Sequence, residues 1–85
     1  MPDDSPLTFP CDLPIKVVGR NTEVFRAAAL AIVREHYGDA HRVTERSSGR
    51  GSYVSLTITV HAESRAEIDA VYHALVANEH VLVVL

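Results

Sequence analysis

The chain contains a single cysteine, no proline after position 14 and no excess of basic residues. One cysteine, Cys11, excludes an intramolecular disulfide framework and is compatible with a reducing cytosol. A formal net charge of −3 provides no overall basic field that would attract a polyanion. No apolar run approaches the length of a membrane span, and the first residues lack the basic start and apolar run of a signal peptide. We therefore expect a cytoplasmic protein that makes no membrane contact.

What the chain does contain is enough apolar material for one small core. Hydrophobic residues make up 47% of the 85 positions, which favours a compact fold but leaves little room for a second domain. All four prolines lie within the first 14 residues, and proline both fixes φ and removes a backbone donor. The sequence therefore predicts an irregular tail over residues 1–13 and a single domain over residues 14–85.

Two segments in the first half of the domain predict a strand and a helix. Residues 15–19 are β-branched and end at a glycine, which is typical of a strand. Residues 22–37 have helical periodicity, with Asn21 or Thr22 as the N-terminal cap and Gly38 as the C-terminal stop. The apolar side chains that we expect to face the core from this helix are Val24, Phe25, Ala28, Ala31 and Ile32.

The second half predicts a hairpin, a helix and a final strand. Residues 41–46 read as a weak edge strand, and residues 53–62 show strict alternation that places Val54 and every second residue after it towards the core. Ser64 and Glu67 form a capping box before a helix. Its expected apolar stripe consists of Ile68, Val71, Tyr72, Leu75 and Val76. Residues 80–85 form a last strand that is apolar on both faces.

The element order is strand, helix, strand, strand, helix, strand. Two crossover units joined by a hairpin predict an α+β fold, a ferredoxin-like βαββαβ two-layer sandwich. We expect a four-stranded antiparallel sheet with the first and third strands in the centre. Both helices should cover one face of this sheet and leave the other face open.

No group of residues has the spacing that chemistry would need. Cys11 lies beside Asp12, whose carboxylate would disfavour the thiolate, and no base is placed to activate it. The five histidines form neither an H-x-H nor an H-x-x-x-H pair, so no metal site is expected. The acidic residues are scattered over the predicted helices. We expect no catalytic residues, no cofactor and no enzymatic activity.

The open sheet face is the best candidate for a site. The third strand directs Tyr53, Ser55, Thr57 and Thr59 outwards, and the first strand adds Lys16 and Val18. The last strand presents either Val81, Val83 and Leu85 or Leu82 and Val84. A small apolar patch on an open sheet marks an interaction surface more often than a catalytic one, so we expect a protein partner or self-association through this face or a sheet edge.

A nucleic-acid role is the weaker alternative for the same face. Tyr53 could stack a base, with Lys16 and Arg20 beside it. Only one aromatic residue lies on this face, and the chain is acidic overall. Nucleic acid is therefore an unlikely partner, and any RNA binding should be weak.

Several short motifs resemble a known family. They are Phe9-Pro10, Lys16-Val17 with Gly19, Arg50-Gly51-Ser52-Tyr53 with Ser55, Thr57-Ile58-Thr59, Tyr72 and the Val-Leu ending. Over about Phe9 to Leu85 the chain resembles the YbeD-like family of small bacterial proteins. The resemblance is sharpest at Arg50, Gly51 and Tyr53, so these residues join the predicted interaction surface. It implies no catalytic residue.

The resemblance also implies a fold similar to ACT regulatory domains. Those domains associate through their sheets and bind small ligands, often amino acids, at a glycine-containing turn after the first strand. Gly19, Arg20 and Asn21 occupy that turn here, although the proline-glycine pair common in ACT domains is absent. The leading hypothesis is thus a regulatory or protein-interaction module acting through its open sheet face, with an ACT-like small-ligand sensor and a weak RNA-binding module as alternatives.

Overall fold

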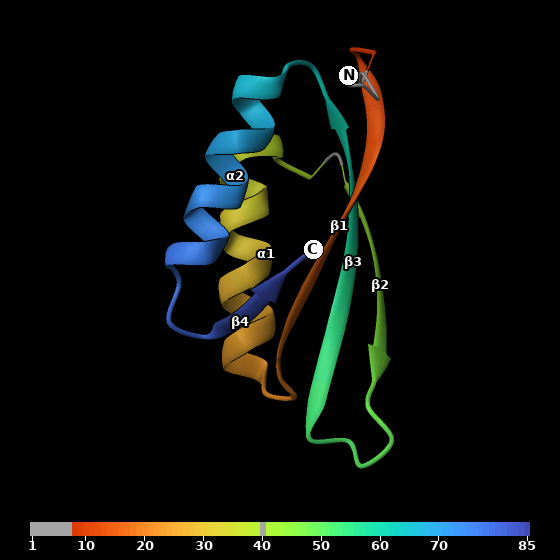
Figure 1. Ribbon diagram of the computed structural model, residues 1–85, viewed down its shortest axis with the longest axis vertical. Coiled ribbons are helices and arrows are strands. Elements are labelled where there is room, and N and C mark those ends of the chain that lie inside the picture. Colours follow the sequence, from red (N-terminus) through yellow and green to blue (C-terminus); the bar gives the residue numbers. More distant parts are fainter. Residues whose placement is uncertain (1–7, 40) are drawn as a thin grey trace, which may run out of the picture.

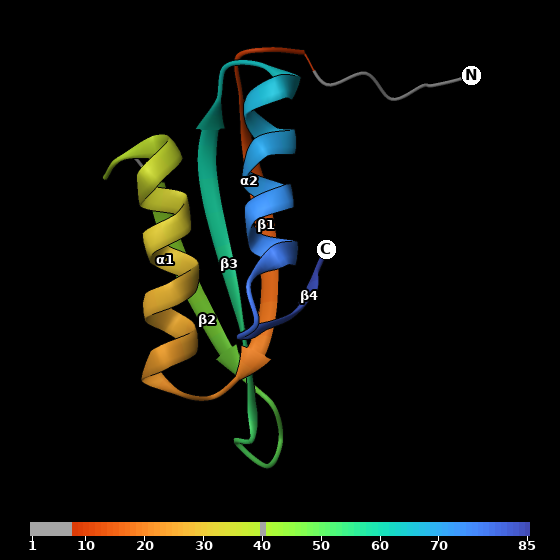
Figure 2. The same cartoon turned by 90° about the vertical axis from the view of Figure 1, so that its left-hand side faces the viewer.

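The computed structural model describes residues 8–39 and 41–85. The elements are β1 (Cys11–Arg20), α1 (Glu23–Tyr37), β2 (His41–Ser47), β3 (Tyr53–Ala62), α2 (Arg65–Ala77) and β4 (Val81–Val84). The strands form one antiparallel sheet in the order β2-β3-β1-β4. Both helices pack on one face of the sheet, and no described element covers the other face (Figures 1 and 2). The predicted ferredoxin-like βαββαβ fold is confirmed.

Strand β1 begins at Cys11, four residues before the predicted start, so residues 11–13 belong to the sheet and not to the irregular tail. The strand continues through Pro14, which pairs with Thr59 of β3. The main chain of Lys16 exchanges hydrogen bonds of 3.3 and 2.8 Å with Leu85, so this side of β1 faces the last strand. Because Pro14 is two residues earlier, its nitrogen points to the same side, beyond the end of β4. The missing N–H therefore costs no ladder hydrogen bond.

Both helices begin at the predicted caps. The Thr22 hydroxyl accepts a hydrogen bond from the amide of Phe25 at 3.1 Å. The Ser64 hydroxyl accepts one from the amide of Glu67 at 3.2 Å, and the Glu67 carboxylate accepts the amide of Glu63 at 3.0 Å. The two hydroxyls satisfy amide donors that the first turns would otherwise leave unpaired, and the Glu67 carboxylate binds the amide one residue before the cap.

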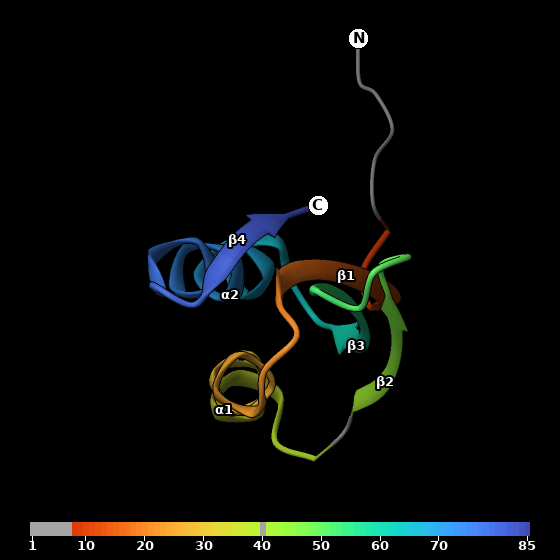
Figure 3. The same cartoon turned by 90° about the horizontal axis from the view of Figure 1, so that it is seen from below.

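The core lies between the helices and the two central strands. Its buried members are Ile15, Val17, Phe25, Ala29, Val33, Val54, Leu56, Ile58, Val60, Val71 and Leu75. Every inward residue predicted for β3 is buried, including Ala62. Edge strand β2 contributes no buried residue and lies at the side of the sheet opposite β4 (Figure 3).

The predicted apolar stripes of the helices are only partly right. On α1, Phe25 alone of the expected set is buried, together with Ala29 and Val33, whereas the Val24 side chain is 56% exposed. The buried side of α1 is rotated about the helix axis relative to the predicted one, because Phe25 packs directly on strand β1. On α2 the stripe is confirmed except at Val76, which is exposed.

The contact between Phe25 and Gly19 decides how α1 sits on the sheet. Gly19 is buried, and a Cβ atom placed on it would lie 2.3 Å from Cδ1 of the Phe25 ring. Real Cβ atoms do not approach a ring so closely, so only glycine allows the phenyl ring to lie against the strand backbone. The glycine that ends the predicted strand therefore serves helix packing.

We expect Gly19→Ala to destabilise the fold by about 1–3 kcal/mol, because the added methyl group overlaps the ring and forces α1 away from β1. Urea unfolding measures this change. Gly49→Ala is the control, since a Cβ there meets nothing within 4 Å, and it should change the unfolding free energy by less than about 0.5 kcal/mol. Equal effects of the two substitutions would contradict the packing role of Gly19.

Candidate interaction surface on the open sheet face

The strand register assembles the uncovered face from residues distant in sequence. Lys16 lies opposite Thr57, which lies opposite Thr44, and Val18 lies opposite Ser55, which lies opposite Arg46. We define the open face as the side chains of Asp12, Pro14, Lys16, Val18, Arg20, Arg42, Thr44, Arg46, Tyr53, Ser55, Thr57, Thr59, His61, Val83 and Leu85.

Most of the predicted interaction residues lie together on this face. Val83 pairs with Val18 in the register, and its side chain is 46% exposed. Leu85 follows on the same side, opposite Lys16, and is 63% exposed. Val81 differs, because the register shifts between Val18 and Gly19 and turns Val81 partly into the core. The apolar part of the open face is therefore Val18, Val83 and Leu85.

The remaining predicted residues, Arg50 and Gly51, lie at the tip of the β2–β3 hairpin. Ser48 closes this tip: its hydroxyl accepts the amide of Tyr53 at 3.2 Å, and its carbonyl accepts the amide of Gly51 at 2.9 Å. Gly51 has a φ of 73°, which glycine adopts without strain. The tip extends beyond the end of the sheet, so it borders the open face.

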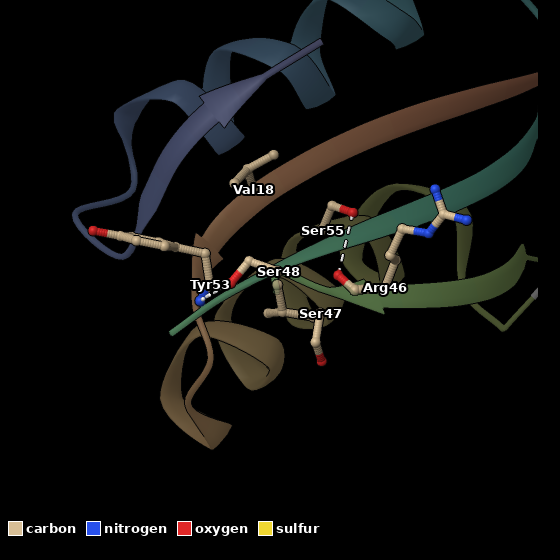
Figure 4. A pocket seen from close by; sticks show the side chains of 7 residues that line it. Val18, Arg46, Ser47, Ser48, Tyr53 and Ser55 are labelled. Atoms are coloured by element: carbon tan, nitrogen blue, oxygen red, sulfur yellow. Dashed lines mark hydrogen bonds between the residues drawn. The ribbon is translucent and has the colours of Figure 1, made fainter. Parts of the chain in front are cut away.

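A shallow hollow of about 170 Å³ lies where the hairpin joins the open face. Val18, Tyr53 and Ser55 line it together with Arg46 and the start of the hairpin (Figure 4). The Arg20 guanidinium lies 5.8 Å from the centre of the Tyr53 ring, which is the geometry of a cation–π contact. One face of the ring is therefore already in contact with a cation.

The open face is basic although the chain is acidic. Lys16, Arg20, Arg42 and Arg46 lie on it, half of the eight lysines and arginines in the chain. Asp12, at the far end of the sheet, is the one carboxylate that the register places there among the described residues. The expectation that a net charge of −3 leaves no basic field holds for the chain as a whole and is wrong for this surface.

Glu45 illustrates how the acidic side chains are kept away from this face. It pairs with the buried Leu56 in the register, so its side chain points to the helix side of β2. Both of its carboxylate oxygens accept hydrogen bonds of 3.1 Å from Arg26 of α1. Arg26 lowers the pKa of Glu45, and the hydrogen bond to Glu45 raises the pKa of Arg26. This ion pair clamps α1 to the edge strand.

The residues of the predicted ligand turn are mostly engaged in contacts within the protein. Gly19 is covered by Phe25, and Arg20 points to the open face. The Asn21 amide donates to the carbonyl of Gly51 at 2.9 Å, and its oxygen accepts a hydrogen bond from Arg26. These contacts join the β1–α1 turn to the hairpin tip. The structure therefore does not bring Gly19, Arg20 and Asn21 together around one space.

A second hollow, of about 380 Å³, lies beside that turn. It is formed between the start of α1 and the connection from α2 to β4. The lining residues are Arg20, Thr22, Val24, Phe25, Glu79, His80 and Leu82. Of the three turn residues expected to hold a ligand, only Arg20 borders it.

The single cysteine is part of the sheet. Cys11 pairs with the buried Ala62 and lies half-buried on the helix side of β1. Tyr37 is also on that side, where burial raises the pKa of its hydroxyl to about 12. Within residues 8–39 and 41–85, no three histidine, cysteine, aspartate or glutamate side chains gather closely enough to hold a metal ion. No helix in these residues is long and apolar enough to cross a membrane.

Several residues of the open face were not anticipated from the sequence. They are Arg42, Thr44 and Arg46, all on β2. The sequence does contain a signal for them. In a hairpin, every second residue of β2 must lie beside the outward residues of β3, and residues 42, 44 and 46 form such a set. The low apolar content of β2 obscured it.

The far end of the open face contains a titratable pair. Nδ1 of His61 lies 2.9 Å from Oδ1 of Asp12, its neighbour across the strands. This hydrogen bond raises the pKa of His61, because it favours the protonated ring, and the charge of Glu63 acts in the same direction. Protonated His61 adds a further positive charge to the open face.

We expect Asp12→Asn to lower the pKa of His61 towards the ordinary value of about 6.5. An NMR titration of the imidazole signals measures it. The folded-state pKa of His61 is raised, so the pair stabilises the fold fully below about pH 6.5 and this contribution is lost as pH rises through the folded-state value. Asp12→Asn should therefore lower Tm more at about pH 6 than at about pH 9.

Asp39→Asn is the control for this titration. Asp39 pairs with Arg34, on a different part of the surface. Its loss should leave the His61 titration unchanged. An unchanged His61 titration in Asp12→Asn would show that the pair does not persist in solution.

Comparison with known proteins agrees with this architecture. A model described as "Protein of unknown function (DUF493)" matches residues 4–85. The chain is 41% identical over 85 residues to a UPF0250 protein of Paraburkholderia phymatum, covering 98% of this chain and 96% of that one. It is 38% identical over 87 residues to UPF0250 protein NE1487 of Nitrosomonas europaea, covering 100% of this chain and 98% of the relative.

The fold is also found in a solved structure. The solution structure of protein HP0495 from H. pylori superimposes with a TM-score of 0.82 at 12% sequence identity. The match covers 100% of this chain and 94% of that one. The resemblance to the YbeD-like family is confirmed. From the match over residues 4–85 and the identity to relatives of nearly equal length, the chain belongs to the DUF493 family, whose members are the UPF0250 proteins.

Proposed function

We propose that this protein is a non-enzymatic regulatory or protein-interaction module whose contact surface is the open face. The observation that carries the proposal is the position of the apolar residues. Val18, Val83 and Leu85 lie side by side on a sheet face that no helix covers, and two of them are about half exposed or more. Exposed apolar side chains that gather in one place indicate a surface that a partner covers.

The shape of the open face also supports a protein contact. Its centre consists of the small side chains Ser55, Thr57 and Thr59, and a hollow of about 280 Å³ beside them is lined by polar and charged residues. A small molecule prefers a mostly apolar pocket, whereas a protein interface accepts such a polar surface around an apolar patch. A standard protein interface buries about 800 Å² on each partner, a modest part of the 5262 Å² of accessible surface of this chain.

The surface is held in place before any partner arrives. The Asn21 side chain ties the hairpin tip to the β1–α1 turn, and Arg26 ties β2 to α1 through Glu45. A surface that is ordered in advance loses less conformational entropy on binding. The open face is thus suited to rigid docking and needs no folding step.

Val83→Asp should weaken capture of the native partner by about tenfold or more, because it places a carboxylate in the apolar part of the interface. Val76→Asp is the matched control: Val76 is also an exposed valine, 68% accessible, but lies on α2 away from the open face. Pull-down from lysate with the tagged wild type and both variants, quantified by mass spectrometry, measures the difference. Equal recovery of the partner by all three proteins would argue against the open face as the contact surface.

A small-ligand sensor is the second candidate, and the hollow beside the β1–α1 turn supports it. Arg20 and His80 line this hollow together with the apolar side chains of Val24 and Leu82. A cationic group next to apolar surface matches the carboxylate and side chain of an amino acid.

RNA binding has less support, since Tyr53 is the one aromatic residue that the register places on the open face of the described chain.

A thermal-shift screen of the amino acids tests the sensor. A ligand present at about 100 times its Kd should stabilise the fold by about 2.7 kcal/mol and raise Tm by about 11–22 °C. Arg20→Gln should abolish the shift, whereas Arg34→Gln, on the exposed side of α1, should preserve it. The absence of any shift at millimolar ligand would count against the sensor.

A further inference from the structure

We propose that the partner of the open face is an acidic protein segment that presents carboxylates and apolar side chains on the same side. The carboxylates contact Lys16, Arg42 and Arg46, and the apolar side chains contact Val18, Val83 and Leu85. This inference rests on the proposed function and specifies the chemistry of the partner.

The first support is the separation of charge in the molecule. The open face holds four cations against one carboxylate, and within residues 8–39 and 41–85 no ion pair links Lys16, Arg20, Arg42 or Arg46 to a carboxylate. Arg26, on the helix side, is by contrast bound to Glu45 and lies near Glu23. The cations of the open face are therefore free to pair with an external anion, and complementary charge also steers such a partner to this side.

The second support is the spacing of these cations. Arg42 and Arg46 are four residues apart on β2, which corresponds to about 13 Å along a strand. Lys16 lies two strands away, in the row between them. An extended peptide places every second side chain on one side, so carboxylates four residues apart match the spacing of Arg42 and Arg46, and the residue between them on that side is left for an apolar side chain. The hydroxyls of Thr44, Thr57 and Thr59 between the cations add hydrogen-bond donors for carboxylate oxygens.

A second copy of the chain does not fit the same face. Two open faces related by a two-fold axis would place cations opposite cations, and such like-charge contacts oppose association. Contact between the open face of one copy and the acidic helix side of another is head-to-tail, which gives rings or open filaments in place of a closed dimer. The open face therefore favours a different protein as its partner.

Nucleic acid fits less well than an acidic protein. Single-stranded binding surfaces combine cations with several aromatic rings, and here the one ring, Tyr53, is already in contact with Arg20. The apolar residues Val18, Val83 and Leu85 find no counterpart in a phosphate backbone. A protein segment with both carboxylates and apolar side chains matches both halves of the open face.

The test uses the full chain labelled with ¹⁵N and three probes in NMR titrations. The probes are a short soluble peptide with glutamate and valine taking turns at every second position and serine between them, its glutamine-for-glutamate counterpart, and oligouridine of the same total charge as the first peptide. In the extended peptide, glutamate and valine therefore lie on the same side. We expect the glutamate peptide to shift amide signals of the open face and to bind about tenfold more tightly than either of the other probes.

Two variants of equal charge locate the contact. Arg42→Gln with Arg46→Gln removes two positive charges from the open face, and Arg34→Gln with Arg65→Gln removes two from the helices. The first pair of substitutions should weaken binding of the glutamate peptide by about tenfold, and the second pair should leave its Kd unchanged. Equal weakening by both pairs would show non-specific attraction and overturn the inference.

The other outcomes are equally decisive. Tighter binding of oligouridine would assign the open face to nucleic acid. Equal binding of the two peptides would show that charge plays no part in recognition, and either result overturns the inference. No binding of the glutamate peptide also overturns the inference. If the partner captured from lysate is lost in Val83→Asp but not in Arg42→Gln with Arg46→Gln, the inference fails while the proposed function stands. If Val83→Asp has no effect either, both fail.

Discussion

The structure depends on the contact between the Phe25 ring and the backbone of Gly19. This contact sets the rotation of α1 about its axis, so that Ala29 and Val33 enter the core and Val24 is left exposed. It also places the next residue, Arg26, within reach of Glu45 on the edge strand and of Asn21 in the preceding turn. One close approach between ring and backbone thus positions the helix, the edge strand and the hairpin tip relative to one another.

The same arrangement explains how an acidic chain acquires a basic surface. Glu45 faces the helices and is neutralised by Arg26, while the residues on either side of it, Thr44 and Arg46, face outwards. Net charge therefore describes this molecule poorly, because its two sides differ in sign. Long-range attraction depends on the side that a partner approaches, and the sheet side is the one that favours anions.

The sequence was sufficient for the fold because its signals are local and agree with one another. The alternation in residues 53–62, the capping box at Ser64 and the element order each point to the same sandwich. It was not sufficient for the rotation of α1, since alanines give a weak periodic signal and the decisive contact is with Gly19 on another element. The basic face was missed for a similar reason: it exists only once the register brings Arg42 and Arg46 of β2 beside β3 and β1.

Pro14 limits the addition of a further strand to the sheet. Strand β4 ends near Lys16, so among the described residues the start of β1 has no strand beside it on that side, where another strand could add. Because Pro14 offers no amide hydrogen at that edge, a strand added there would lose one of its main-chain bonds. At the opposite edge, the exposed charges of Arg42 and Arg46 on β2 disfavour pairing with a further strand. The start of β1 and the β2 margin thus resist the edge-to-edge pairing that leads to fibrils, whereas the apolar strand β4 forms the remaining edge of the sheet.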